Sequence, residues 1–388
     1  MTRTSPFRSQ FDALEISGIA KIASQALDDP DVIPLWFGEG DLPTGSPMLE
    51  HAKQALDEGQ TFYSYPRGRT ALRQALVDYH RRIYGIDLHP DRVHVPGSTM
   101  LSITIAVHSV TKPGDHGLIV SPNWPNVAMV FDAHGVDYDY VRQDLIDDCW
   151  TLDIDKVKAA CRANTRMIFC NSPCNPTGWI LAADQQSELL AFCRQRGIVL
   201  LADEVYHRNI FEGEVAPSFL SLATDDDPVI VVNGFSKAWA MTGWRLGWMV
   251  TPKGFAEQFA VMAEIYNTGA TAFTQFGGVA ALRDGEAVVA ELRQLYATNR
   301  ALVLDLLGRH PRVELAPPSG AFYAFPRIDG ITSSLAFANR ALHEKKVGVA
   351  PGYTFGPDNE AFIRICFAIS TPRLEQALTR IVALLGQR

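Results

Sequence analysis

Apolar runs and segments with helical periodicity alternate through the middle of the 388-residue chain. Four short runs, rich in β-branched residues and bounded by turn residues, predict buried strands at residues 116–120, 166–170, 198–202 and 229–232. Between them, residues 153–162 and 184–196 carry apolar positions at helical spacing with charges opposite, which predicts crossover helices. The alternation predicts an α/β fold in which helices sandwich a mostly parallel sheet.

The C-terminal part of the chain follows a different pattern. Helical spacing covers residues 286–308 and 334–345, and residues 360–369 are typical of a strand. We therefore expect a large domain of residues 45–285, which carries the parallel sheet, and a smaller α+β domain formed by residues 1–44 and 286–388.

Lys237 follows the apolar run at 229–232, so it lies just past the carboxyl end of a predicted strand. Ligands of open α/β sheets bind at that edge. A lysine in a partly dry site can lose its proton and form an imine with an aldehyde. A lone lysine is more often a solvated loop residue, so this interpretation depends on its neighbours.

Acidic, phenolic and amide side chains follow two more predicted strands. Asp203 is at the same edge as Lys237, where an ionised carboxylate keeps a pyridine nitrogen protonated. Tyr206, three residues on, is placed to donate a hydrogen bond to a phenolic oxygen of such a ring. Asn175 lies in a Pro- and Gly-containing turn that can aim its amide into a cavity. The competing interpretation of Asp203 is a helix N-cap.

Ser98 and Thr99 precede an apolar helix predicted from about residue 100 to 110. Backbone N–H groups and two hydroxyls at a helix N-terminus suit an anion, most naturally phosphate, although such a sequence is more often only a cap. Arg245 offers the fork-shaped cation that a phosphate dianion favours. Trp124 follows the predicted strand at 116–120, where its ring either stacks on an aromatic cofactor or fills the core.

Composition and charge narrow the class of protein. The formal net charge of −8 and the calculated pI near 5.7 argue against general binding to nucleic acid or to anionic membranes. The N-terminal segment has no apolar secretory core and no apolar stretch reaches membrane-spanning length, so we expect a cytoplasmic protein. The six cysteines form no CxxC pair, which argues against disulfides and against a metal site.

Several motifs, in this order, resemble the fold-type I pyridoxal-phosphate-dependent enzymes of the class I and II aminotransferase family. The resemblance covers nearly the whole chain and rests on these motifs: Gly38-Glu-Gly-Asp41, Tyr63-Ser-Tyr-Pro-Arg-Gly68, Asn175-Pro-Thr-Gly178, Asp203-Glu-Val-Tyr206, Ser236-Lys237 with Met241-Thr-Gly-Trp-Arg245, Gly320-Ala-Phe-Tyr323 and Ile363-Arg-Ile365. The family's usual Gly-Glu-Pro-Asp is altered in the first motif. Tyr353 also stands where a smaller residue is common, which makes the shape of the pocket unusual.

The resemblance implies pyridoxal 5'-phosphate as the cofactor. It implies that Lys237 forms the imine with the cofactor aldehyde, that Asp203 pairs with the pyridine nitrogen, and that Asn175 and Tyr206 bond the ring hydroxyl. Trp124 matches the aromatic residue that stacks on the ring. The residues that match the phosphate-binding group are Ser98, Thr99, Ser236 and Arg245.

The same resemblance implies how substrate and subunits meet. Arg364 matches the arginine that grips the α-carboxylate of the substrate, with Gly38 and Asn175 beside it. Tyr63 matches a tyrosine that reaches the phosphate from the neighbouring subunit, which implies a homodimer with shared active sites. The implied reaction is a ping-pong transfer of the amino group of an L-amino acid to a 2-oxo acid.

Four aromatic residues are expected near the pocket: Trp36, Phe37, Phe322 and Tyr323. They favour neutral or aromatic amino acids as substrates, although they fit a core equally well. Thr99 stands where some aspartate-preferring relatives have a lysine. A C–S lyase or a cyclopropane-forming synthase on the same fold is the alternative, and either would release pyruvate, ammonia or ethylene without an acceptor. A ligand-sensing regulator needs a DNA-binding domain, for which a pattern that begins by about Leu35 leaves no room.

Overall fold

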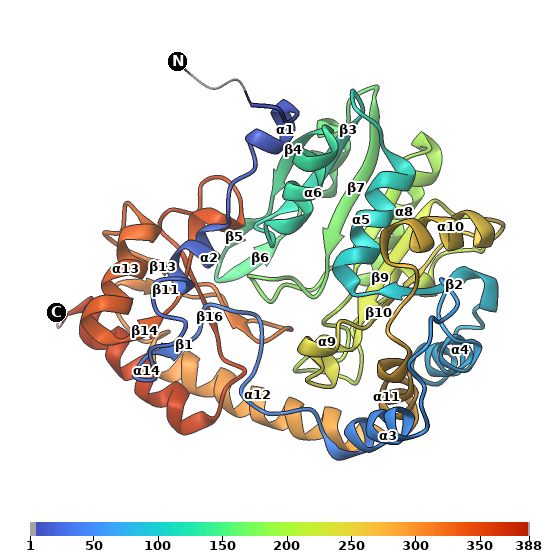
Figure 1. Cartoon of the computed structure of the whole chain (residues 1–388). Coiled ribbons are helices and arrows are strands. Elements are labelled where there is room, and N and C mark those ends of the chain that lie inside the picture. The colour runs from blue at the N-terminus through green and yellow to red at the C-terminus, as the bar shows by residue number, and fades with distance from the viewer. Residues whose placement is uncertain (1–4, 387–388) are drawn as a thin grey trace.

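The computed structural model describes residues 5–386, and its largest sheet has seven strands (Figure 1). Their order across the sheet is β2 (Val93–Gly97), β10 (Gly247–Val250), β9 (Val229–Gly234), β8 (Val199–Asp203), β7 (Thr165–Asn171), β3 (His116–Ser121) and β4 (Asp137–Arg142). Neighbours from β9 to β4 pair in parallel, whereas β10 runs antiparallel to both β9 and β2. The prediction of a mostly parallel sheet is confirmed, and β3, β7, β8 and β9 are the four predicted strands.

Successive side chains of the central strands enter two different apolar cores, one on each face of the sheet. In β7, Met167 and Phe169 belong to one core, and Ile168 and Cys170 to the other. The first core is completed by α5 (Thr99–Val110), α6 (Asn126–His134) and α10 (Ala256–Asn267). The second is completed by helices that include α4 (Thr70–Tyr84), α7 (Ile154–Ala160) and α8 (Ala183–Arg196). Because both faces are covered, the central strands β7, β8 and β9 carry unbroken apolar runs.

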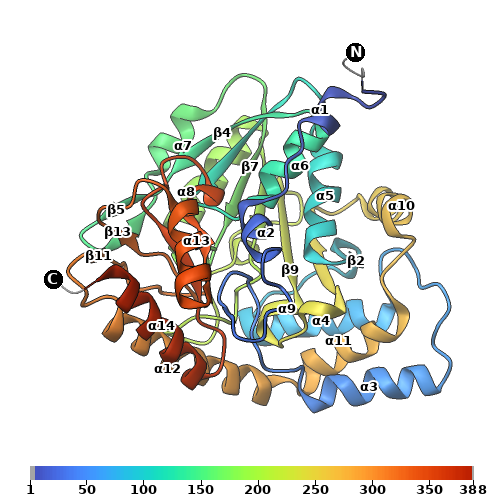
Figure 2. The ribbon, with the colours of Figure 1, turned by 60° about the vertical axis from the view of Figure 1, so that its left-hand side comes forward.

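A smaller α+β region packs beside the sheet, on the left of Figure 1. Its helices are α12 (Glu286–Leu306), α13 (Ser334–Lys345) and α14 (Thr371–Leu385). The N-terminal segment joins this region because β1 (Ile33–Pro34) pairs in parallel with β14 (Val347–Gly348). Figures 1 and 2 both show α12 running beneath this region towards α3 and α11. The smaller α+β domain is as predicted, while its division from the large domain at residues 44 and 285 stays a prediction.

The remaining elements are shorter or lie at the periphery. They are the helices α1 (Ser9–Asp12), α2 (Gly18–Ala23), α3 (Ser46–Asp57), α9 (Phe235–Ala238) and α11 (Ala272–Asp284), and the strands β5 (Asp144–Ile146), β6 (Cys149–Thr151), β11 (Val313–Glu314), β12 (Tyr323–Ala324), β13 (Arg327–Ile328), β15 (Ala350–Pro351) and β16 (Ile363–Cys366). Within residues 5–386, no helix combines the length and the apolar character that crossing a bilayer requires.

The strand predicted over residues 360–369 is wrong at both ends, because β16 spans only Ile363–Cys366. The buried amide of Asn299 donates hydrogen bonds to the carbonyls of Phe367 and Ile369, both at 2.7 Å, which turns these carbonyls towards α12. Before the strand, the N–H of Phe362 donates to the carbonyl of Asn359 in a turn. The apolar residues on either side of β16 are therefore buried outside the strand, and Phe362 forms only an isolated bridge with Arg327.

Candidate active site

The carboxyl ends of β7, β8 and β9 lead into one cavity of about 570 Å³. Asn171 and Asp203 are register partners at the ends of β7 and β8, and both line the cavity. Lys237 lies in α9, which begins directly after β9 ends at Gly234. The parallel register therefore brings together side chains that are far apart in the sequence, at the edge of the sheet where ligands of this architecture bind.

Lys237 is partly buried, and its amine donates a hydrogen bond to the carbonyl of Gly38 at 2.5 Å. Burial lowers the pKa of Lys237 to about 8, and the positive charges of Arg364 and Arg245 act in the same direction. Cys366 and Glu39 oppose this shift. A lysine with this pKa is partly neutral near physiological pH, as a nucleophile or a general base must be.

Asp203 is buried at the end of β8, and its Oδ1 accepts the N–H of Val205 at 3.1 Å. Burial raises the pKa of Asp203 to about 7, against the opposing effects of that hydrogen bond and of Lys237. The N-cap interpretation of Asp203 is wrong, because residues 205–208 form a turn and not a helix. A positively charged group in the cavity would keep this carboxylate ionised.

Arg364 projects from β16 and is 2% exposed. Its guanidinium donates to the carbonyl of Trp36 and to Oδ1 of Asn175, the latter at 3.0 Å, and it lies 4.6 Å from the centre of the Tyr323 ring. Its Nε is buried and has no hydrogen-bond partner within the described part of the chain. These partners are neutral, so the positive charge of Arg364 remains available to an anionic group in the cavity.

Thr99 begins α5 at the other end of the cavity, and its hydroxyl donates to the carbonyl of Asn233 at 2.9 Å. Two glycines allow this close approach: a Cβ at Gly234 would lie 2.2 Å from Oγ1 of Thr99, and a Cβ at Gly247 would lie 2.5 Å from the Thr99 nitrogen. The N-terminus of α5 thus faces the cavity directly. This arrangement favours an anion.

Ser236 and Arg245 line the same cavity as Thr99. Arg245 adopts a left-handed backbone conformation with φ of 52°, and its guanidinium donates to the carbonyl of Thr242 at 2.6 Å. Ser98 caps α5, with its hydroxyl accepting the N–H of Leu101 at 3.2 Å, and its side chain does not line the cavity. The Ser98 side chain is therefore engaged as a helix cap and is not placed for the anion.

The other predicted residues divide into two groups. Trp124, Asn175, Tyr206 and Gly38 line the cavity. Tyr63 does not line it, and its side chain is 91% exposed. Three of the aromatic residues expected near the pocket line it, namely Trp36, Phe37 and Tyr323. The fourth, Phe322, packs in the core instead. Tyr353 lies outside this cavity and contributes to a smaller one.

Sequence reasoning missed several lining residues. Ser17, Ile19 and Ala20 enter from α2 and its N-cap, and Met100 enters from α5. Asn171 was detectable, because it ends a predicted strand beside Asp203. The residues of α2 carry no such signal, since nothing local places a short N-terminal helix over a distant sheet edge.

The residues of the cavity fit pyridoxal 5'-phosphate. They comprise an amine for its aldehyde, a buried carboxylate for its ring nitrogen, and a helix N-terminus with an arginine for its phosphate. Arg364 also lines the cavity, and its neutral partners leave its positive charge uncompensated, which suits a substrate carboxylate. A cavity of this volume is in the usual range for a cofactor with a small substrate. Within residues 5–386, no group of three or more His, Cys, Asp or Glu side chains is arranged to hold a metal ion.

Comparisons with known proteins agree with this chemistry. The family model described as aminotransferase class I and II matches residues 31–381. An aspartate aminotransferase of Pyrococcus horikoshii is 33% identical, over 94% of this chain and 93% of that protein. An aromatic-amino-acid aminotransferase of Thermococcus litoralis is 34% identical, over 97% of this chain and 98% of that protein.

Among solved structures, an alanine aminotransferase from Pyrococcus furiosus superposes with a TM-score of 0.91 at 27% identity, covering 98% of this chain and all of that one. The family match spans the strand ends and every lining residue described above except those of α2 and its N-cap. The chain therefore belongs to the class I and II aminotransferase family and is a pyridoxal-phosphate-dependent aminotransferase.

Proposed function

We propose that this enzyme moves the amino group of a neutral or aromatic L-amino acid to a 2-oxo acid by a ping-pong mechanism, with Lys237 as its catalytic residue. The observation that carries the proposal is that the Lys237 amine, the Asp203 carboxylate and the uncompensated Arg364 guanidinium line one cavity. When bound, pyridoxal 5'-phosphate supplies an aldehyde that condenses with amines and a ring that takes up electrons from the substrate α-carbon.

Lys237 would hold the cofactor through its amine, and the same amine would move the proton at the substrate α-carbon. Its pKa of about 8 suits this role, because a general base works best when its pKa is near the operating pH. Asp203 holds the proton on the ring nitrogen by remaining ionised opposite it. Trp124 would cover the ring, and the start of α5, with Ser98, Thr99, Ser236 and Arg245, would hold the phosphate.

Asn175 connects the cofactor with the substrate. Its Oδ1 accepts a hydrogen bond from Arg364, which leaves its amide N–H groups free to donate to the ring oxygen. Arg364 binds the α-carboxylate, with Gly38 and Asn175 beside it, and thereby sets the α-carbon where Lys237 can reach its proton. One arginine contact therefore orients both halves of the site.

The preference for substrates with neutral or aromatic side chains rests on the charges and the apolar residues that line the cavity. The cations of the lining are Lys237, Arg245 and Arg364, each of which has a role above, so within residues 5–386 none remains for a side-chain carboxylate. Ile19 and Trp36 give the cavity lining apolar surface instead. Values of kcat/KM for phenylalanine, leucine and aspartate test this preference, and a clear advantage for aspartate would contradict it.

We propose a homodimer in which Tyr63 completes the site of the partner subunit. Phe62 and Tyr63 are 84% and 91% exposed, an exposure that is costly for adjacent aromatic residues without a covering surface. A mixing experiment tests the sharing of sites. Lys237→Ala and Tyr63→Ala proteins, each impaired alone, should regain activity when their subunits are exchanged, because one site of each mixed dimer is intact. Absence of recovery in mixed dimers would contradict shared sites.

The test of the reaction itself is an absorbance spectrum of the cofactor-loaded enzyme, followed by single amino acids without an acceptor. We expect a band near roughly 400 nm that true donors convert to one near roughly 330 nm. The Lys237→Ala protein should bind the cofactor but show neither the first band nor turnover. Release of pyruvate, ammonia or ethylene without an oxo acid would favour the C–S lyase or the cyclopropane-forming synthase.

We also propose a cytoplasmic location for this enzyme, which cell fractionation would test.

A further inference from the structure

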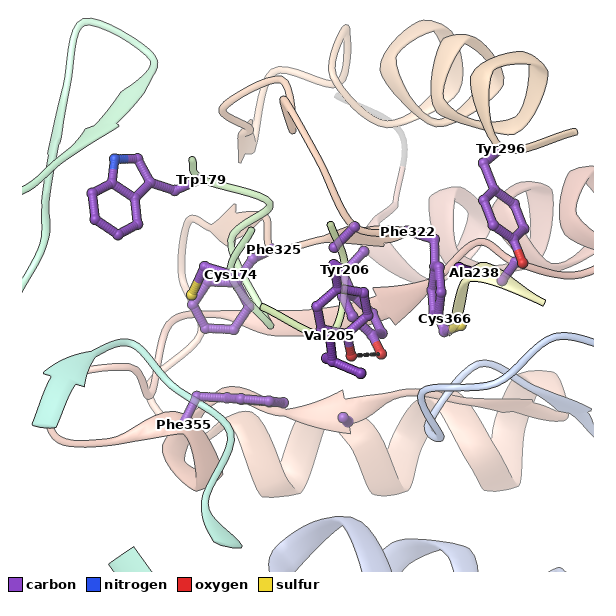
Figure 3. Close-up of a cluster of buried hydrophobic side chains, with 14 of the residues drawn as sticks. Cys174, Trp179, Val205, Tyr206, Ala238, Tyr296, Phe322, Phe325, Phe355 and Cys366 are labelled. Carbon is purple, nitrogen blue, oxygen red and sulfur yellow. Dashed lines mark hydrogen bonds between the residues drawn. The ribbon is translucent and has the colours of Figure 1, made fainter. Parts of the chain in front are cut away.

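Tyr323 lies at the centre of the site, although no role has been assigned to it above. It belongs to β12, is fully buried and lines the cavity. Its hydroxyl lies 2.7 Å from the hydroxyl of Tyr206, a hydrogen bond drawn as a dashed line at Tyr206 in Figure 3. Its ring lies under the guanidinium of Arg364. One side chain thus contacts both the proposed ligand of the ring oxygen and the proposed ligand of the α-carboxylate.

The two hydroxyls share one hydrogen bond, so one of them must donate and the other must accept. Burial raises the pKa of Tyr206 and of Tyr323, which keeps one proton on each oxygen. If Tyr206 donates to Tyr323, its only proton is used and none is left for the cofactor. Within the described part of the chain, the Tyr323 hydroxyl has no hydrogen-bond partner other than Tyr206.

We propose that Tyr323 is a positioning residue whose hydroxyl donates to the Tyr206 oxygen and so directs the Tyr206 proton towards the ring oxygen of the cofactor. The inference rests on the proposed role of Tyr206 as donor to that oxygen. Accepting a hydrogen bond polarises the Tyr206 hydroxyl and makes it a stronger donor. Its donated hydrogen bond stabilises the anionic form of the ring oxygen, which lowers the pH at which the bound chromophore loses its proton.

The space for this hydroxyl depends on Gly38. A Cβ at residue 38 would lie 2.2 Å from the Tyr323 hydroxyl oxygen, whereas the next nearest atom of that ring is at 3.3 Å. The glycine of the Gly38-Glu-Gly-Asp41 motif is therefore required by the hydroxyl and much less by the ring. Gly38 and Tyr323 should consequently act as a coupled pair.

The decisive experiment is a pH titration of the visible absorbance of the cofactor-loaded Tyr323→Phe enzyme, because phenylalanine keeps the ring under Arg364 and removes only the hydroxyl. We expect the titration midpoint to rise by roughly half a unit to one unit, the effect of one hydrogen bond. We expect kcat to fall about tenfold and KM for the amino acid to change less than about twofold, because the ring still supports Arg364.

Tyr296→Phe is the matched control. Tyr296 is also a buried tyrosine, and its ring centre lies 5.1 Å from that of Phe322, the neighbour of Tyr323 (Figure 3). It does not line the cavity. Its removal should leave the midpoint unchanged. Gly38→Ala, which displaces the Tyr323 hydroxyl, should raise the midpoint in the wild-type background and have no further effect on it in Tyr323→Phe.

A midpoint that falls in Tyr323→Phe would overturn the inference, because it would mean that Tyr206 had been donating to Tyr323. An unchanged midpoint would overturn it as well. Tyr206→Phe separates the two levels of the argument. If Tyr206→Phe raises the midpoint and Tyr323→Phe does not, only the role of Tyr323 is refuted. If Tyr206→Phe leaves the midpoint unchanged, the proposed role of Tyr206 is refuted with it.

Discussion

Replacing Lys237 by methionine should stabilise the cofactor-free protein at neutral pH while abolishing transamination. The partly buried lysine has a pKa of about 8, below its ordinary value of 10.5. The folded protein therefore holds this proton less tightly than the unfolded chain does. The resulting loss of stability is fully present below pH 8 and fades as the pH rises from 8 to 10.5, where the unfolded lysine also becomes neutral.

The depressed pKa corresponds to at most about 3 kcal/mol of lost stability at pH 7. Methionine has a similar length and no charge, so it removes this cost. It also removes the hydrogen bond from the charged amine to the Gly38 carbonyl, which offsets the gain by about 1.5 kcal/mol. The net expectation is a variant that is about 1 to 2 kcal/mol more stable at pH 7 and no more stable than the wild type above pH 10.

Urea denaturation of the two cofactor-free proteins, at equal protein concentration and at several pH values, measures this difference. Comparing variant with wild type at each pH cancels the other groups that titrate in the same range. Lys112→Met, at an exposed position, is the control for the general effect of losing a lysine. A Lys237→Met protein that is less stable at pH 7, or whose advantage grows with pH, would refute the reasoning.

Three further predictions concern the reaction. The rate at which cofactor-free enzyme takes up pyridoxal 5'-phosphate should rise with pH and level off above about pH 8, because only the neutral Lys237 amine attacks the aldehyde. Stopped-flow absorbance measures this rate, and a rate that falls over this range would contradict the prediction. Asp203→Asn keeps the shape of the side chain but not its charge, so single-turnover rates should fall at least about 100-fold with the cofactor still bound, and a near-normal rate would contradict its role. Arg364→Lys replaces a planar fork by a point charge, so initial-rate measurements should show KM for amino acids raised about tenfold or more, whereas an unchanged KM would remove Arg364 from carboxylate binding.

The strand ends that carry the site were predictable because their signals are local. The continuous apolar runs that became β7, β8 and β9 end in polar residues, and parallel pairing aligns those ends without further information. The strands β2 and β10 escaped prediction for the opposite reason. β10 is a short antiparallel insertion whose only partners, β2 and β9, are selected by the assembled sheet and not by any pattern within Gly247–Val250.

The contacts between side chains could not be predicted. Tyr206 and Tyr323 are 117 positions apart, and only the packing of the smaller region against the sheet brings their hydroxyls together. Phe322 and Tyr323 were both expected near the pocket, yet only Tyr323 lines it. Successive side chains of an extended segment point to opposite sides, so one of two neighbours enters the cavity and the other the core, and the sequence does not say which.

The pairing of β1 with β14 and the hydrogen bond from Arg364 to the Trp36 carbonyl, which joins residues 328 positions apart, have a consequence for synthesis of the protein. A growing chain already contains Lys237 and Asp203 well before Arg364 is made, and until then the segment around Trp36 lacks both β14 and the Arg364 guanidinium as partners. The arginine that binds substrate and the strand that holds the N-terminal segment are therefore both made after the residues that hold the cofactor. A chain that stops short of Arg364 therefore carries the reactive lysine without the arginine that orients the substrate.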